Sequence, residues 1–298
     1  MSEHKLNAEY INEVHSVQID SLKDIGLTDE EVAAFEGYKG VIGPKLYGYV
    51  LKPLGYPHFP HPLRKVAQML LSLNSDLVIG DKEKFVKEIF SEANKYKDSK
   101  ERVEGEITYH SVPKKLSQHE DILFNLEVLH FFVLNGINIE LPGTVRSRGK
   151  QSEFGVRMDG IFFHLEAKKL NRSVLDNKIF GDPVESLLRA KSESNDTVIL
   201  SDDQQRKIRK QFKEMLKGAK NKFTDYNDHY VVAMDVGWPL SCLGKKINTY
   251  INGNEYFTDN DDHFLGVLFK LYHEEKAEFY FHANPNLESN PFTSMMDI

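Results

Sequence analysis

One stretch of the chain, EFGVRMDGIFFHLEAKKL at Glu153–Leu170, decides the expected fold. Apolar and polar residues alternate along it, as side chains do on a strand whose two faces differ. Asp159 and Gly160 stand in its middle, and Asp-Gly is a strong signal for a two-residue hairpin turn. We therefore expect two antiparallel strands joined at these two residues.

The register of this hairpin brings acidic residues together. If Met158 pairs with Ile161, counting outward puts Glu153 directly across from Glu166, with Cβ atoms about 5 Å apart. Two carboxylates at that separation repel each other unless a cation lies between them. A Mg²⁺ ion would neutralise both and also hold a phosphate oxygen and a water. Lys168 shares a strand face with Glu166, where an ammonium group can stabilise developing charge or position the attacking water.

The segments around the hairpin predict an α/β core. A helix is expected at Ser117–Asn135, closed by Gly136 and followed by a short strand at Ile137–Leu141. After the hairpin the pattern predicts a basic helix at Gln204–Phe223 and strands at Tyr230–Val236, Phe264–Tyr272 and Glu278–His282. This order indicates a mixed central sheet flanked by helices.

The part of the chain before the core reads as mostly helical. Helical patterns occupy residues 5–37, 63–73 and 81–96, with a loop-like segment rich in Gly, Pro and Tyr at 38–62. The charged stretch 97–106 separates these patterns from the helix expected at Ser117–Asn135. We expect a mostly helical N-terminal region at residues 1–108 and a core domain at residues 109–298.

The hairpin resembles the PD-(D/E)XK nuclease superfamily, also called restriction-endonuclease-like. Its hallmark is an acid at the start of one strand and an (Asp/Glu)-x-Lys triplet on the next, and Glu166-Ala167-Lys168 matches the triplet. Two acids compete for the first position. Glu153 has the spacing of a hairpin. Asp159 has the residue type that the superfamily prefers, but it would lie about 20 Å along the strand from Glu166.

The resemblance implies an enzyme that uses Mg²⁺ or Mn²⁺ to hydrolyse phosphodiester bonds of DNA, with RNA as the alternative substrate. Glu166 would hold the metal together with Glu153 or Asp159, and Lys168 would assist the chemistry. Glu127, on the helix before the first core strand, would support the metal or the water. Many relatives pair to cut both strands, so a homodimer is also implied, with a role in restriction, repair or defence.

Basic residues gather where the resemblance expects nucleic acid. Residues 111–222 hold 20 Lys and Arg against 15 Asp and Glu, an excess of five positive charges. The resemblance covers roughly residues 115–285. The residues expected to contact phosphates lie in the loop after the first strand and on the basic helix: Arg146, Arg148, Lys150, Arg206, Lys207, Arg209, Lys210 and Lys213.

The composition bears on the location of the protein and on the kinds of site that it can hold. The single cysteine, Cys242, excludes a disulfide within the chain and argues against thiolate zinc sites, so a reducing, cytoplasmic location is expected. The sequence has no apolar run of membrane-spanning length, and no membrane association is expected.

Two other functions stay open. One is a nucleic-acid-binding module that keeps the nuclease fold without catalysis. The other is a protein-interaction module that uses the acidic residues 223–298, which hold 4 Lys and Arg against 12 Asp and Glu.

Overall fold

The computed structural model describes residues 23, 26–38, 62–94, 112–141, 152, 154–158, 160–169, 202–223, 229–236, 257, 262–273, 276–287, 290 and 292. These residues belong to two compact units, Met1–Pro142 and Gly143–Ile298. Each unit has its own buried core.

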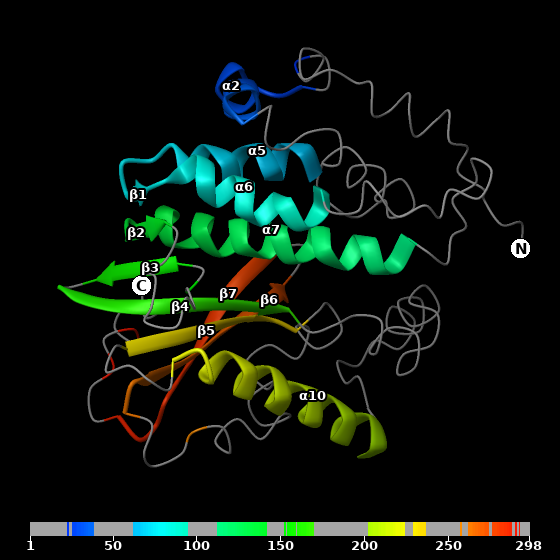
Figure 1. The fold of residues 1–298 in the computed structure, drawn as a ribbon, viewed down its shortest axis with the longest axis vertical. Helices are drawn as coiled ribbons and strands as arrows, with labels where there is room; N and C mark the ends of the chain where they lie inside the picture. Colours follow the sequence, from blue (N-terminus) through cyan, green and yellow to red (C-terminus); the bar gives the residue numbers. More distant parts are fainter. Residues whose placement is uncertain are drawn as a thin grey trace, which may run out of the picture. The chain divides into compact units, whose positions relative to one another are not determined.

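The first unit is mostly helical in its described part (Figure 1). Its elements are α2 (Asp29–Gly37), α5 (Pro62–Leu73), β1 (Val78–Gly80), α6 (Lys82–Asn94), α7 (Val112–Leu134) and β2 (Asn138–Leu141). Strands β1 and β2 pair in parallel. The predicted helices at 63–73, 81–96 and 117–135 are confirmed. Of the helix predicted at 5–37, residues 29–37 form α2 and most of the rest lies outside the described residues.

Helix α7 decides where the first unit ends. It contacts both α5 and α6, and it also contacts β2. Buried side chains such as Leu126, Leu129 and Phe132 form the apolar face of the helix. By its contacts the chain divides after Pro142. The boundary predicted near residue 108 falls on residues 95–111, which lie outside the described part of the chain, and it stays a prediction.

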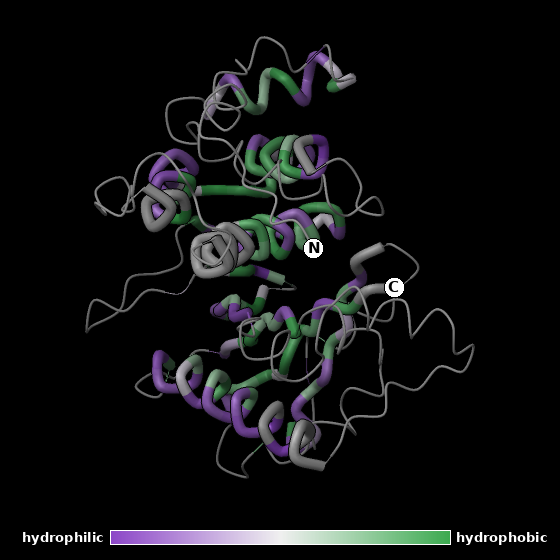
Figure 2. Tube along the Cα trace, turned by 90° about the vertical axis from the view of Figure 1, so that its right-hand side faces the viewer, coloured by the Kyte–Doolittle hydropathy of each residue, from purple (hydrophilic) through white to green (hydrophobic). Residues whose placement is uncertain are grey.

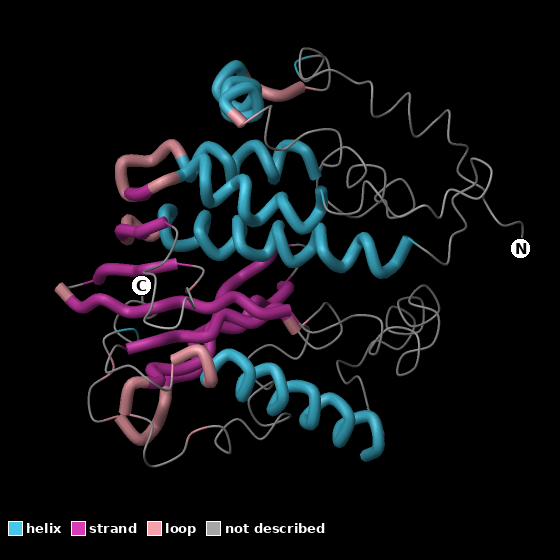
Figure 3. The backbone as a smooth tube through the Cα atoms, viewed as in Figure 1, coloured by secondary structure: helices cyan, strands magenta, loops and turns pink. Residues whose placement is uncertain are grey.

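The described part of the second unit contains five strands of mixed direction and one long helix (Figure 3). Its elements are β3 (Phe154–Met158), β4 (Ile161–Lys169), α10 (Asp202–Lys220), β5 (His229–Asp235), β6 (Phe264–His273) and β7 (Lys276–Ala283). The strands lie in the order β3, β4, β5, β6, β7. The pairs β4–β5 and β5–β6 are parallel, while β3–β4 and β6–β7 are antiparallel. The expected α/β class with mixed strand directions is confirmed.

The hairpin of β3 and β4 has the predicted register. Met158 pairs with Ile161 and Arg157 with Phe162. Gly160 has a φ of 79°, a conformation that glycine adopts without the clash a side chain would cause. The turn chemistry and the strand alternation thus agree, which is why a local pattern was sufficient to predict the pairing.

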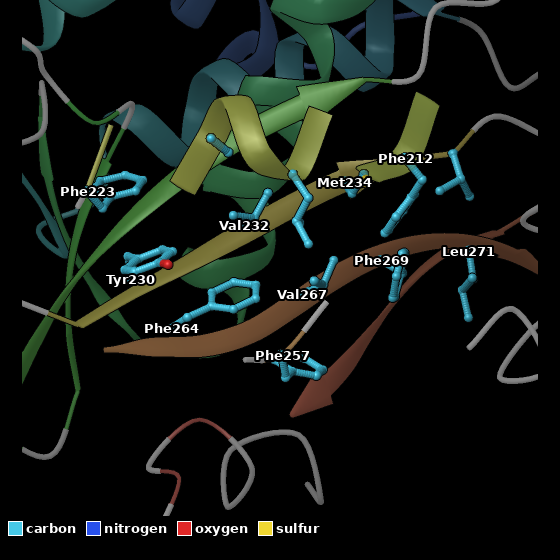
Figure 4. Close-up of a cluster of buried hydrophobic side chains, with 13 residues drawn as sticks. Phe212, Phe223, Tyr230, Val232, Met234, Phe257, Phe264, Val267, Phe269 and Leu271 are labelled. Atoms are coloured by element: carbon cyan, nitrogen blue, oxygen red, sulfur yellow. The ribbon is translucent and has the colours of Figure 1, made fainter. Parts of the chain in front are cut away.

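One face of the sheet packs against α10. Helix α10 alternates hydrophilic and hydrophobic residues along its length (Figure 2). Its apolar side chains Phe212, Leu216 and Ala219 recur at helical spacing and are buried against the strands. Figure 4 shows this cluster, in which alternate residues of β5 and β6 meet the helix; the cluster comprises Phe212, Leu216, Ala219, Phe223, Tyr230, Val232, Met234, Val236, Phe257, Phe264, Val267, Phe269 and Leu271. Because these apolar side chains of α10 must be buried, the helix covers the sheet face that carries the apolar residues of the cluster.

We predict that Gly266→Ala strongly destabilises the second unit. Gly266 has a φ of 151°, and a Cβ added there would lie 2.7 Å from Cζ of Phe281 and also against the backbone of β7. Backbone strain and overpacking together should cost about 3 kcal/mol of unfolding free energy. Urea denaturation followed by circular dichroism measures the loss.

Gly218→Ala is the matched control for that substitution. Gly218 lies within α10, and an added Cβ would meet nothing within 4 Å. Alanine in a helix interior should stabilise by about 0.5–1 kcal/mol. Equal effects of the two substitutions would contradict the close approach of β6 and β7 at Gly266.

We predict that stability falls as the pH drops below about 6.5, in part because of His282. Burial lowers the pKa of His282 from its ordinary value of 6.5. As the pH falls, His282 therefore gains a proton in the unfolded chain before it does so in the folded one. The stability that neutral His282 gives the fold is fully present above pH 6.5 and is lost as the pH falls toward the folded pKa. We expect the unfolding free energy, measured at pH 7.5, 6.5 and 5.5, to fall more steeply in the wild type than in His282→Phe. The two slopes should differ by at most about 1.4 kcal/mol per pH unit. Parallel slopes would argue against a neutral, partly buried His282.

Candidate functional site

Glu166 is an ionisable residue in the middle of the second unit's sheet. It lies on β4 beside Val232 of β5, and Val232 belongs to the cluster under α10. The side chain of Glu166 is 0% exposed. Among the described residues, neither of its carboxylate oxygens has a hydrogen-bond partner. A carboxylate in such surroundings needs compensating positive charge, because desolvation strongly disfavours an isolated buried ion.

Two lysines supply that charge. The ammonium groups of Lys168 and Lys222 both contact Oε1 of Glu166. Each lysine side chain is 31% exposed and so reaches solvent. The three side chains together carry one net positive charge, at a place that anions can approach.

The two lysines reach Glu166 by different routes. Lys168 follows Glu166 by two residues on β4, so strand alternation puts both on one face, as predicted. Lys222 lies in the turn after α10, where its N–H donates to the carbonyl oxygen of Ala219 at 3.0 Å. The next residue, Phe223, is buried and stacks on Tyr230 with ring centroids 4.7 Å apart. Packing of Phe223 therefore holds Lys222 over β4.

A buried histidine lies on the same face of β4 as Glu166 and contacts a buried serine that precedes β3. His164 precedes Glu166 by two residues and is 1% exposed. Its Nδ1 lies 3.1 Å from the hydroxyl oxygen of Ser152, which is also buried. The His164 ring stacks near Phe223 with centroids 5.9 Å apart. These contacts make His164 a packed residue that supports the hairpin beside Glu166.

A second charged cluster occupies the opposite face of the same sheet. Asp235, the last residue of β5, pairs in register with Lys169 of β4 and Lys270 of β6. Its Oδ2 lies 3.9 Å from Nζ of Lys169 and 3.6 Å from Nζ of Lys270. All three side chains are at most 8% exposed. The sequence pattern assigned no chemistry here, because the three residues come from three strands and share no local motif.

The two candidates for the first metal acid, Glu153 and Asp159, both lie outside the described residues. The pairing of Phe154 with Leu165 is the last described step of the register. One further step in the same register would pair Glu153 with Glu166, as the sequence predicts. Within the described part of the chain, no group of three or more His, Cys, Asp or Glu side chains is arranged to hold a metal ion. The choice between the two acids therefore stays a prediction.

Glu127 is buried on α7 in the first unit. Its carboxylate contacts the ammonium group of Lys65 on α5. One turn further along α7, Nδ1 of His130 is in hydrogen-bond contact with the Ser72 hydroxyl. Burial and the positive charge of Lys65 lower the pKa of His130, while Glu127 opposes them. These contacts tie α5 to α7, and support of a metal or water by Glu127 stays a prediction.

The predicted phosphate-contacting residues lie in the segment after β2 and on α10. Arg146, Arg148 and Lys150 lie outside the described residues. On α10, the side chains of Arg206, Lys210 and Lys213 are exposed and that of Arg209 is half-buried, while the side chain of Lys207 is not described. An exposed basic helix face suits phosphate contact, which stays a prediction for these residues.

The basic residues at the end of α10 have different surroundings from one another. Nζ of Lys220 lies 4.4 Å from the ring centroid of Phe264, a cation–π contact over the core. Lys222 turns to Glu166 instead, and Lys217 is exposed. Sequence reasoning grouped all three as basic and missed the role of Lys222. No signal in the sequence separates them, because a lysine two residues beyond a helix has no fixed direction.

Comparison of the chain with protein-family models, with curated proteins and with solved structures gave no match in any of the three. A search of the described helices found none with both the length and the apolar character needed to cross a bilayer. The geometry around Glu166 is therefore the basis for assigning a function.

We predict that Lys168 and Lys222 substitute for each other in stabilising the buried Glu166. Lys168→Met or Lys222→Met alone leaves one ammonium group and should cost about 1 kcal/mol of unfolding free energy. The double variant leaves a buried carboxylate without a described cation and should cost about 3–5 kcal/mol. Urea denaturation in the presence of a chelator measures this non-additivity.

Adding Glu166→Gln to the double variant provides the control. The amide removes the unpaired charge, so most of the excess loss should be recovered. Strictly additive losses in the double variant would show that a group other than these two lysines compensates Glu166.

Proposed function

We propose that the chain is a metal-dependent nuclease of the PD-(D/E)XK type that hydrolyses phosphodiester bonds of DNA. One observation carries the proposal: Glu166 is fully buried on the sheet with an ammonium group of the same strand face beside it. The order α7, β2, the β3–β4 hairpin, α10 and β5 along the chain also supports it, since this is the order expected for that core.

Glu166 fits a divalent metal as one of its ligands. Its two oxygens accept no hydrogen bond from the described residues, and Mg²⁺ and Mn²⁺ prefer carboxylate oxygen. Glu153 or Asp159 would supply the second carboxylate. When bound, the metal would lower the pKa of a coordinated water and neutralise charge on the phosphate.

The chain's own residues provide orientation and electrostatic stabilisation. Lys168 holds a positive charge next to the buried Glu166, which lies beside Val232 of the apolar cluster under α10. A fixed ammonium group in such a site stabilises negative charge that develops on a phosphate oxygen. The exposed Arg206, Lys210 and Lys213 would bind backbone phosphates of DNA and hold the substrate in register.

Binding without catalysis is the second candidate. It is favoured by one specific observation: Lys168 and Lys222 together overcompensate the charge of Glu166 without any metal. A protein of this kind would bind nucleic acid through the net positive charge of the cluster and the basic helix. Calorimetric titration with Mn²⁺ separates the two candidates, because a binding module without the metal site gives no saturable heat.

We predict that metal-dependent cleavage of DNA is lost in Glu166→Gln and in Lys168→Met. The first removes a metal ligand and the second removes a charge that stabilises the transition state, so each should reduce the rate about 100-fold or more. Cleavage of linear, circular and branched DNA with Mg²⁺ or Mn²⁺ is the measurement. Circular dichroism should verify that both variants are folded.

Lys84→Ala is the control for loss of a lysine. Lys84 lies on α6 in the first unit, where its side chain is 49% exposed and forms an ion pair with Glu88, one turn along the helix. Its removal should leave cleavage unchanged. Full activity of both Glu166→Gln and Lys168→Met would refute the proposed nuclease.

A further inference from the structure

Two ammonium groups and one carboxylate oxygen form an arrangement that a divalent cation would disturb. Lys168 and Lys222 both contact Oε1 of Glu166, and the carboxylate is 0% exposed. A divalent ion bound to Glu166 would add two positive charges beside these two. Like charges at contact distance in a poorly solvated place repel strongly. A divalent ion on this carboxylate would therefore meet repulsion from both ammonium groups.

We infer that Lys222 occupies the cation position of Glu166 in the metal-free protein and that a divalent metal must displace it. This inference rests on the proposed function, because it concerns the metal site of that nuclease. It adds to the site a residue that lies 56 positions after Glu166 in the sequence (222 − 166). The resting protein thereby keeps its buried carboxylate neutralised until a metal arrives.

The fold indicates that Lys222 and not Lys168 is the lysine that leaves. Lys168 lies on a strand paired along its length with β5, two residues from Glu166 on the same face. Lys222 lies in a turn beyond the last residue of α10. Its backbone is held by the bond to Ala219 and by the buried Phe223. Rotation of its long, partly exposed side chain therefore releases Glu166 without moving the helix or the sheet.

The displacement has a consequence for metal affinity. Free energy spent in separating Lys222 from Glu166 is subtracted from the binding free energy of the metal. A variant without this ammonium group should bind the metal more tightly. A lysine that merely anchors α10 would instead affect stability and leave the affinity unchanged. Affinity is thus a readout that a purely structural role would not change.

The test is a calorimetric titration of the full chain with Mn²⁺, for the wild type, Lys222→Met and Lys217→Met. Lys217 is the matched control, since it is an exposed lysine near the same end of α10, whereas Lys222 is the one that contacts Glu166. We expect Lys222→Met to bind Mn²⁺ about tenfold more tightly than the wild type. Lys217→Met should differ from the wild type by less than about twofold.

The salt concentration distinguishes two explanations for tighter Mn²⁺ binding by Lys222→Met. One is loss of the contact between Lys222 and Glu166, and the other is loss of long-range charge repulsion. Salt screens exposed charges farther apart than about 10 Å at 0.1 M ionic strength, but screens buried contacts much less. The tighter binding of Lys222→Met should therefore persist when the KCl concentration is raised about tenfold. A gain that disappears in high salt, or is matched by Lys217→Met, would overturn the inference.

The outcomes distinguish this inference from the proposed function. Saturable Mn²⁺ binding that is equal in the wild type and Lys222→Met, and absent in Glu166→Gln, supports the metal site and overturns the displacement by Lys222. Binding seen in Lys222→Met and not in the wild type supports the displacement in its strongest form. Absence of saturable binding in both proteins overturns the metal site and the inference together.

Discussion

The second unit depends on compensation of one buried carboxylate. Glu166 lies in the sheet where its neighbours are apolar, and burial of an uncompensated carboxylate there would cost several kcal/mol. Lys168 and Lys222 offset that cost from two directions, one along β4 and one from the end of α10. The ion pairs therefore link the hairpin to the helix that covers it. Any change in the charge at this point affects both elements.

Charged side chains lie on both faces of the sheet at the carboxyl ends of β4 and β5. Lys168 and Lys169 are neighbours at the carboxyl end of β4, and alternation directs them to opposite faces. One meets Glu166, while the other meets Asp235 at the carboxyl end of β5. In open α/β sheets, ligands commonly bind at the carboxyl ends of parallel strands. The position of the two clusters agrees with a ligand site at this edge.

The surroundings of Glu166 bear on both candidate functions. Buried oxygens without hydrogen bonds from the described residues favour a metal, whereas two ammonium groups favour an anion. These preferences are compatible in a phosphodiesterase, because a metal and a phosphate bring opposite charges to the same place. A binding module would need only the cations. The buried carboxylate is the feature that such a module does not require, and its desolvation cost makes it hard to explain by phosphate binding alone.

Local patterns were sufficient for much of the fold. The Asp-Gly turn and the alternation around it determined the pairing of Met158 with Ile161 and the shared face of Glu166 and Lys168, because neighbours on a strand have fixed directions. The basic helix predicted at Gln204–Phe223 is α10, Asp202–Lys220. The α/β class followed from the order of these elements.

Only the tertiary structure decided how deeply Glu166 is buried and which cations meet it. Alternation says that two residues share a face, but whether a helix covers that face depends on packing far along the chain. Lys217, Lys220 and Lys222 are equivalent as sequence, yet one is exposed, one lies over Phe264 and one contacts Glu166. The anchoring of Phe223 in the core sets that difference. A contact between residues so distant in the chain arises from three-dimensional packing, which no local pattern encodes.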